Sequence, residues 1–225
     1  MHIFSLLTFT VFLTYLYIAS YAARLKTKSS LKWSFFAVCC CCGIWSFCYT
    51  FIYPSQDISI TWLWYRISSI GWCILPSLCL HFILIYLKLD KYLKKWYISF
   101  LYYTIPIVFL VKSLTGILIA KEFLVGSLGV YEIHDTTSLW YWSYCIFNTI
   151  CLATSTVLLF YKKKKSKDQR FIKQANILII CFISCGFLVY VINLILPAIN
   201  ILDFPAIGAS ANVILTLASY YSISR

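Results

Sequence analysis

Long runs of apolar residues dominate the chain, and short polar connections separate them. Each run is long enough to cross the hydrocarbon core of a bilayer as a helix, which takes about 20 apolar residues. Seven such runs follow one another, at about 2–23, 33–53, 63–87, 96–120, 139–161, 177–197 and 206–223. The alternating segments of about 10 residues that build a membrane barrel are not seen. The pattern therefore predicts an all-α, polytopic membrane bundle of seven transmembrane helices.

The composition agrees with this pattern and fixes the surroundings of the bundle. Of 225 residues, 62% are hydrophobic and 12% are charged, and the mean hydropathy is +0.84. Soluble domains carry about 25% charged residues, so lipid rather than water must cover this surface. The net charge of +12 would suggest nucleic acid in a soluble protein, but here the basic residues flank apolar runs. We therefore expect one transmembrane domain over 1–225 in the cell (cytoplasmic) membrane, and no nucleic-acid partner.

Charged residues fall unequally on the two sides of the predicted spans. Most Lys and Arg residues lie in the connections after the first, third and fifth runs, and Lys162–Lys165 is the densest stretch. Most acidic residues lie on the other side, several of them in the connection Lys121–Ser138. Because cytoplasmic loops carry an excess of Lys and Arg, the N-terminus is predicted outside and the C-terminus in the cytoplasm. The basic residues follow the first run, which favours a retained helix over a cleaved signal peptide.

The eleven cysteines all lie inside the predicted spans, and Cys39–Cys42 are consecutive. None lies in a predicted outer connection, where an oxidising compartment would make a disulfide useful. Cysteine packs as a small hydrophobic residue, so we interpret these side chains as packing residues. A metal or redox role is the weaker alternative, and no metal ligands are assigned.

Small and polar residues recur three or four positions apart in several runs, so each set shares one helix face. The first interpretation is close packing between membrane helices. The alternative is a polar cavity between the outer ends of the third to seventh helices, below the Glu132–Asp135 connection. The residues assigned to this ligand or signal site are Arg66, Lys112, Tyr144, Asn148 and Asn193. The two cations suggest an anionic or polar ligand, because charge in lipid is costly and usually faces protein or water; the competing account is that both reach the interface.

One histidine lies deeper in the predicted bundle. His81 falls toward the cytoplasmic side of the third run. A neutral histidine that is hydrogen-bonded in the helix packing is the leading interpretation, and a proton-linked role is the alternative.

The sequence lacks the motifs of several membrane enzymes and receptors. The serine of Gly208-Ala209-Ser210 resembles that of intramembrane rhomboid proteases, but no histidine follows it as a base. The seventh run has no lysine for a retinal Schiff base, and no H-E-x-x-H zinc motif or phosphate-binding loop occurs. We therefore expect no catalytic residues, no cofactor and no enzymatic activity.

The third run carries a resemblance to a known family. The segment Trp64–Trp72, followed by Pro76 and His81–Phe82, is similar to a helix with arginine, glycine, proline and histidine-phenylalanine in one group of membrane proteins. That group is the N-terminal seven-transmembrane region of bacterial and archaeal sensor histidine kinases. Further likeness lies in three later segments, Arg170–Ala175, Asn193–Pro197 with Pro205, and Tyr220–Arg225.

The resemblance implies a signal-input module that transmits a stimulus to a cytoplasmic histidine kinase or another output protein. The family usually carries a kinase domain after this region, whereas this sequence shows no phospho-accepting histidine region and no ATP-binding domain. The output is therefore expected to be missing or on another chain, so that a truncated kinase and a stand-alone sensor both stay open. The stimulus is an unknown small ligand, and homodimerisation is left open. The alternative function is a small multi-pass transporter or membrane enzyme that uses the polar residues of the bundle, and a membrane scaffold is the third.

Overall fold

The computed structural model describes residues 3–25, 29–93, 95–116, 118–126, 129–196 and 208–224. Seven α-helices occur in these ranges, each within one predicted run and its flanks. They are α1 (Ile3–Arg24), α2 (Ser29–Ile52), α3 (Ile58–Tyr86), α4 (Trp96–Thr115), α5 (Leu139–Lys165), α6 (Gln169–Tyr190) and α8 (Gly208–Ser224). A 3₁₀ turn, η1 (Asp90–Tyr92), precedes α4, and a π-helical segment, η2 (Val191–Ile195), continues α6. The helical prediction is confirmed for the described residues.

Helix starts are marked by polar side chains in the connections. Asp57 accepts a hydrogen bond from the Ser59 backbone N–H at 2.7 Å at the start of α3. Ser138 and Asp168 begin α5 and α6 in the same way, with distances of 3.2 and 2.9 Å. Such caps satisfy backbone donors that have no partner within the helix.

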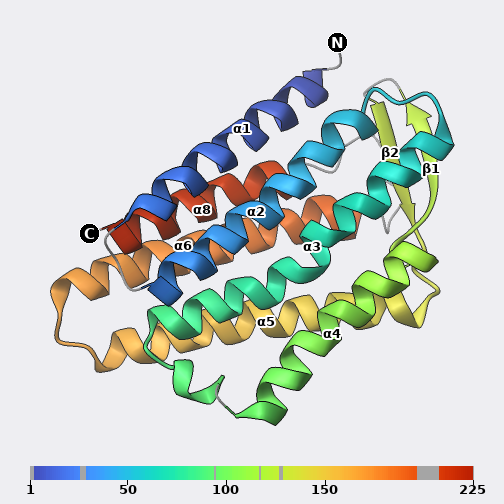
Figure 1. Ribbon diagram of the computed structural model, residues 1–225. Helices are drawn as coiled ribbons and strands as arrows, with labels where there is room; N and C mark the ends of the chain where they lie inside the picture. The colour runs from blue at the N-terminus through green and yellow to red at the C-terminus, as the bar shows by residue number, and fades with distance from the viewer. Residues whose placement is uncertain are drawn as a thin grey trace.

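Five of the helices form a closed ring (Figure 1). The ring runs α2, α3, α5, α6 and α8, and α8 returns to α2, while α1 packs against both α2 and α8. Helix α4 lies outside this ring and packs on α3. The helices whose faces meet inside the ring therefore come from both halves of the sequence.

The surface of the bundle is apolar where lipid would meet it. Ile146, Ile150 and Val157 of α5 are each more than half exposed, as are Ile180 and Phe187 of α6. Five described helices, α1, α2, α3, α5 and α6, are long and apolar enough to cross a membrane. The apolar part of α4 (Tyr102–Thr115) and the 17-residue α8 are shorter. The structure therefore supports a multi-pass membrane protein, with the number and limits of the spans left as predictions.

A two-stranded antiparallel hairpin closes one end of the bundle (Figure 1). Strand β1 (Ala120–Gly126) pairs with β2 (Gly129–His134). One face is buried, and Phe123 packs against Trp62 and Tyr65 of α3 with ring centroids 4.7 and 5.1 Å apart. The sequence predicted only a connection here, so the hairpin is a correction to the purely helical architecture.

The fourth predicted run, 96–120, also ends differently from the prediction. Helix α4 stops at Thr115, and Gly116 is extended. Leu118, Ile119 and Ala120 are buried where the chain enters the hairpin, and the Ala120 backbone N–H donates to the Tyr65 hydroxyl at 3.3 Å. These apolar residues continue the hydrophobic run, although they pack on protein in extended form.

The central pair of helices approaches closely at Gly71. A Cβ atom at this position would lie 2.4 Å from the backbone oxygen of Cys41 in α2. Glycine lets the two backbones come into contact, as small residues commonly do between membrane helices.

Helix α4 contains a proline whose effect on the backbone is compensated from α3. Pro106 has no N–H, so the Tyr102 carbonyl four residues earlier loses its helical donor. The Ser77 hydroxyl donates a hydrogen bond to this carbonyl at 3.4 Å. An unsatisfied carbonyl is costly away from water, so Ser77 both supports α4 and joins it to α3.

Candidate ligand-binding cavity

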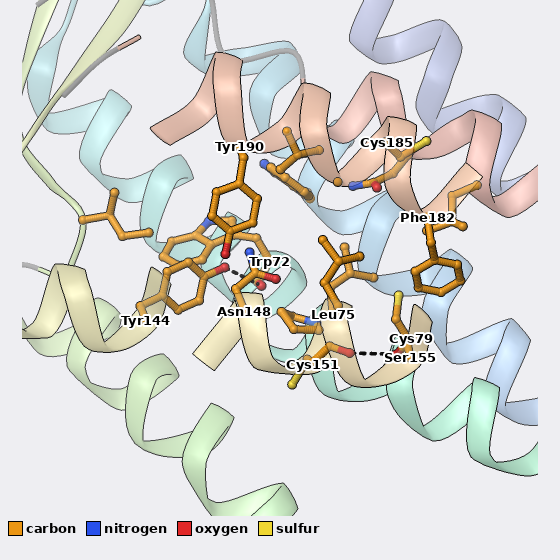
Figure 2. Close-up of a pocket in the computed structure, with 18 of the residues that line it drawn as sticks. Trp72, Leu75, Cys79, Tyr144, Asn148, Cys151, Ser155, Phe182, Cys185 and Tyr190 are labelled. Carbon is orange, nitrogen blue, oxygen red and sulfur yellow. Dashed lines mark hydrogen bonds between the residues drawn. The ribbon is translucent and has the colours of Figure 1, made fainter. Parts of the chain in front are cut away.

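A cavity of about 120 Å³ lies inside the ring of helices (Figure 2). It extends from the hairpin to the middle of the bundle, between α2, α3, α5, α6 and α8. The lining residues are Trp45, Tyr49, Tyr65, Trp72, Leu75, Pro76, Cys79, Ile119, Glu132, His134, Tyr144, Asn148, Cys151, Leu152, Ser155, Phe182, Cys185, Gly186, Val189, Tyr190, Asn212 and Leu215. A concave, largely apolar space with a few polar groups is the usual form of a small-molecule site.

The hairpin end of the cavity carries its carboxylate. The Tyr49 hydroxyl of α2 donates a short hydrogen bond to Glu132 Oε1. His134 Nε2 lies 3.5 Å from Glu132 Oε2, and the side chains of His134 and Glu132 are 2% and 10% exposed. His134 Nδ1 is buried and has no partner among the described residues. The hairpin therefore places an acid and a histidine at the mouth of the bundle, and Tyr49 ties the acid to α2.

Two amide side chains occupy the middle of the cavity. Asn148 of α5 and Asn212 of α8 both line it, and no hydrogen bond of either side-chain amide is found within the described part of the chain. Across the space, the Tyr190 hydroxyl donates to the Cys145 carbonyl at 2.8 Å and also contacts Thr149. The two amides thus keep donors and acceptors for a bound molecule, whereas Tyr190 is engaged by α5.

Tyr144 has a structural partner on α3. Pro76 removes the N–H that would pair with the Trp72 carbonyl. The Tyr144 hydroxyl donates to that carbonyl at 3.0 Å, and the Tyr144 and Trp72 ring centroids are 5.4 Å apart (Figure 2). Tyr144 therefore repairs the proline break in α3 and at the same time forms part of the cavity wall.

The inner end of the cavity is apolar. Leu75 and Phe182 face the space there, near Cys79 (Figure 2), and Leu152 also lines the cavity. The Ser155 hydroxyl is satisfied by the Cys151 carbonyl of its own helix at 2.8 Å. This end offers contact area rather than polar recognition.

The structure brings together only part of the predicted site. Tyr144 and Asn148 line the cavity, whereas Arg66 and Lys112 are not among its lining residues. Arg66 is exposed, with its guanidinium carbon 5.8 Å from the centre of the Trp62 ring. The Lys112 amine lies 5.5 Å from the centre of the Trp140 ring. Long basic side chains near helix ends can reach outward, so helical spacing alone does not fix which neighbour they meet.

The other two assigned residues lie apart from the described lining. The side chain of Asn193 is outside the described residues, although its backbone belongs to η2. His81 is half-buried between α3 and α4, and its Nδ1 lies 2.6 Å from the Tyr103 hydroxyl. This is the hydrogen-bonded arrangement expected of a packing histidine. The proton-linked role remains untested.

Several lining residues carried no local signal in the sequence. The Glu132–Asp135 connection was expected above the cavity, but not that Glu132 and His134 would enter its wall. Tyr49 and Asn212 lie more than 160 positions apart and meet the same space only through the ring of helices. Pairing of distant helices is a property of the fold, which no single run of residues encodes.

The eleven cysteines are free thiols, and eight are buried while Cys40, Cys79 and Cys181 are half-buried. Within the described residues, no group of three or more His, Cys, Asp or Glu side chains is arranged to hold a metal ion.

Comparison with known protein families identifies a match over most of the chain. The family model described as the N-terminal 7TM region of histidine kinase matches residues 6–222. No curated protein matches the chain.

Proposed function

The chain belongs to the family of N-terminal 7TM regions of histidine kinases, and from this premise we propose that its cavity is the input site of a membrane sensor. The region matched is the sensor part of such proteins, so the role is one of binding and transmission rather than catalysis. In this proposal the hairpin end faces outward, and the basic ends of the helices face the cytoplasm and a histidine kinase or another output partner.

The observation that carries the proposal is a pair of amides, Asn148 and Asn212, which have no hydrogen bond among the described residues and line a cavity between five helices. Buried polar groups in proteins are normally hydrogen-bonded. A ligand that satisfied both amides would join α5 to α8 and favour the arrangement of helices in which it fits. A ligand shifts such an equilibrium only through different affinities for the two states.

Helix α8 is the element through which we expect the shift to leave the cavity. Its first turn is held by the Tyr15 hydroxyl, which donates to the Ala209 carbonyl at 2.6 Å, and by Cys185, which contacts the Ala211 carbonyl. Asn212 and Leu215, one turn further on, line the cavity. Small displacements of packed helices are a common form of switching, and α8 runs from the cavity to the basic end of the bundle (Figure 1).

The π-helical segment η2 supports the same proposal. It begins directly after Val189 and Tyr190, which line the cavity. Single π-helical turns are rare and frequently lie at functional sites, because the wider turn leaves backbone groups that can be rearranged. A change of register in η2 would alter the side of α6 that faces the cavity.

The test is a fusion of a histidine kinase output domain after Arg225, assayed by autophosphorylation in membrane vesicles. Asn148→Leu, which removes an amide without opening space, should change the output at least about threefold relative to the unsubstituted fusion. Ser143→Leu is the matched control, since Ser143 lies on the same helix but is exposed.

Abundance in the membrane is measured in parallel for each fusion. If Asn148→Leu lowers abundance, Asn212→Leu and Leu152→Phe, which alter other walls of the cavity, replace it. Output equal to that of the Ser143→Leu control in every well-expressed cavity variant would contradict the proposal.

A further inference from the structure

We propose that the cavity selects an organic cation, a protonated amine with a small apolar body. This inference rests on the proposed input site and assigns the chemical class of its ligand. Among the described residues that line the cavity, the carboxylate is Glu132 and no Lys or Arg is present. Arg66 and Lys112, which suggested an anionic ligand, lie against Trp62 and Trp140 instead. The sign of the charge at the site is therefore opposite to that of the whole chain, which is +12.

The carboxylate is buried and incompletely compensated. Glu132 is 10% exposed, and an ionised carboxylate can accept about four hydrogen bonds. Tyr49 supplies one donor to Oε1, while His134 Nε2 is 3.5 Å from Oε2, which is beyond a normal hydrogen bond. A buried carboxylate requires an opposite charge or several donors. An ammonium group has three donors and a positive charge, so it meets both requirements.

Aromatic rings form the wall beside this carboxylate. Trp45 and Tyr49 lie with ring centroids 6.4 Å apart on α2, and Tyr65 and Trp72 lie 5.8 Å apart on α3. All four line the cavity, and Tyr144 continues the wall onto α5. Trp and Tyr faces attract cations, and sites for ammonium ligands commonly combine such rings with a carboxylate.

The rest of the cavity limits the size and polarity of the ligand body. The volume is about 120 Å³, which is below the volume of about 150 Å³ of a cavity that holds one benzene ring. The apolar body is therefore one small ring at most, and the ammonium group has to lie beyond it, beside Glu132 at the hairpin end. Leu75, Leu152 and Phe182 form an apolar end away from Glu132. The layout suits an ammonium group at the hairpin and one ring or a short alkyl chain directed toward the middle of the bundle.

A competing arrangement is that protonated His134 serves as the cation for Glu132. Among the described residues, this pair is joined by a single long contact of 3.5 Å, and His134 Nδ1 has no partner there. Replacing His134 by glutamine removes that cation and separates the two arrangements.

The experiment uses the full chain in nanodiscs of a zwitterionic lipid, with three probes of nearly equal shape: benzylammonium, benzyl alcohol and phenylacetate. Binding is measured by calorimetry and by the shift of thermal unfolding. Benzylammonium should bind at least about tenfold more tightly than benzyl alcohol, and phenylacetate should bind more weakly than either. Glu132→Gln should abolish the preference for the ammonium probe, whereas Glu122→Gln, an exposed acid on the other strand, should leave it unchanged.

The proposal is overturned if benzyl alcohol or phenylacetate binds as tightly as benzylammonium, if benzylammonium does not bind, or if it binds only after His134→Gln. It is also overturned if Glu132→Gln retains the preference. Where Glu132→Gln does not fold, Tyr49→Phe and Glu132→Asp are used. Each of these substitutions should weaken the binding of benzylammonium more than the binding of benzyl alcohol. These results are independent of the kinase fusions, so altered output in the cavity variants would still support the input site if the ligand class failed.

Discussion

Single hydroxyl groups compensate for both prolines inside the described helices. Tyr144 serves the carbonyl freed by Pro76, and Ser77 serves the one freed by Pro106. Each hydroxyl comes from a different helix than the proline, so the repair also joins two helices. The polar residues that the sequence placed on helix faces are thus partly explained by backbone hydrogen bonding. The amides of Asn148 and Asn212 have no hydrogen bond of this kind among the described residues.

A double-mutant cycle tests the link between Tyr144 and Pro76. Tyr144→Phe should lower the free energy of unfolding by about 1 kcal/mol, because the Trp72 carbonyl loses its donor. In a Pro76→Ala background the alanine N–H supplies that donor, so Tyr144→Phe should cost markedly less. Unfolding titrations in mixed micelles measure the coupling between the two substitutions. Equal costs in both backgrounds would show that the tyrosine does not act on this carbonyl.

The cysteines give a second prediction for individual side chains. Because eight are buried and three half-buried, a membrane-impermeant thiol reagent should label few of them in intact cells. Thr137→Cys, at an exposed position after the hairpin, provides a labelled control. Labelling of the unsubstituted chain to the level of this control would contradict the packing role of the cysteines.

The close approach of α2 and α3 depends on the absence of a side chain at Gly71. Gly71→Ala would bring a Cβ atom to 2.4 Å from the Cys41 carbonyl, so the helices would have to separate. We expect a loss of about 1–3 kcal/mol in unfolding free energy, as in other overpacked interiors. The same shift would disturb Trp72 and Trp45, which line the cavity from these two helices.

Gly43→Ala is the matched control for this prediction. Gly43 lies on α2, and a Cβ atom there would meet side-chain atoms at 3.7 Å, an ordinary contact. This substitution should be neutral or slightly stabilising, since alanine favours the helix. Thermal unfolding of the two purified variants compares them directly, and a similar loss for both would contradict the role assigned to Gly71.

The helices could be predicted from the sequence because each long apolar run must hydrogen-bond its own backbone groups when lipid surrounds it, and a helix does so. The hairpin could not, because Leu118–Ala120 are as apolar as a span and only their packing on Tyr65 reveals the extended form. The same limit applies to the site. Asn148 could be assigned to the cavity because polar residues at helical spacing mark one face of its helix. Glu132 could not be assigned in this way, because its position depends on which helices the hairpin packs against. The direction of the Arg66 side chain could not be read from helical spacing, because a long side chain can turn toward the ring of Trp62.

The bundle as a whole is polarised by charge from one end to the other. The end near the hairpin holds Asp57, Glu122, Glu132 and Asp135 together with Arg66, Lys112 and Lys121, whereas the opposite end is strongly basic, with Lys162–Lys165 and Arg170. The cavity reaches the hairpin end, and α8 leads away from it. In the proposed function these are the input end and the output end, with the hairpin end outside.

The last prediction concerns this orientation. The excess of Lys and Arg at the α1–α2, α3–α4 and α5–α6 connections predicts that they are cytoplasmic. A reporter enzyme that is active only in the cytoplasm should therefore be active when it is fused after Arg225, and silent when it is inserted between β1 and β2. A second reporter, active only outside, should give the reverse, which controls for misfolded fusions. If the hairpin insertion is active inside and the C-terminal fusion is silent, the charge argument fails. Glu132 would then face the cytoplasm, and the proposed input would have to come from within the cell.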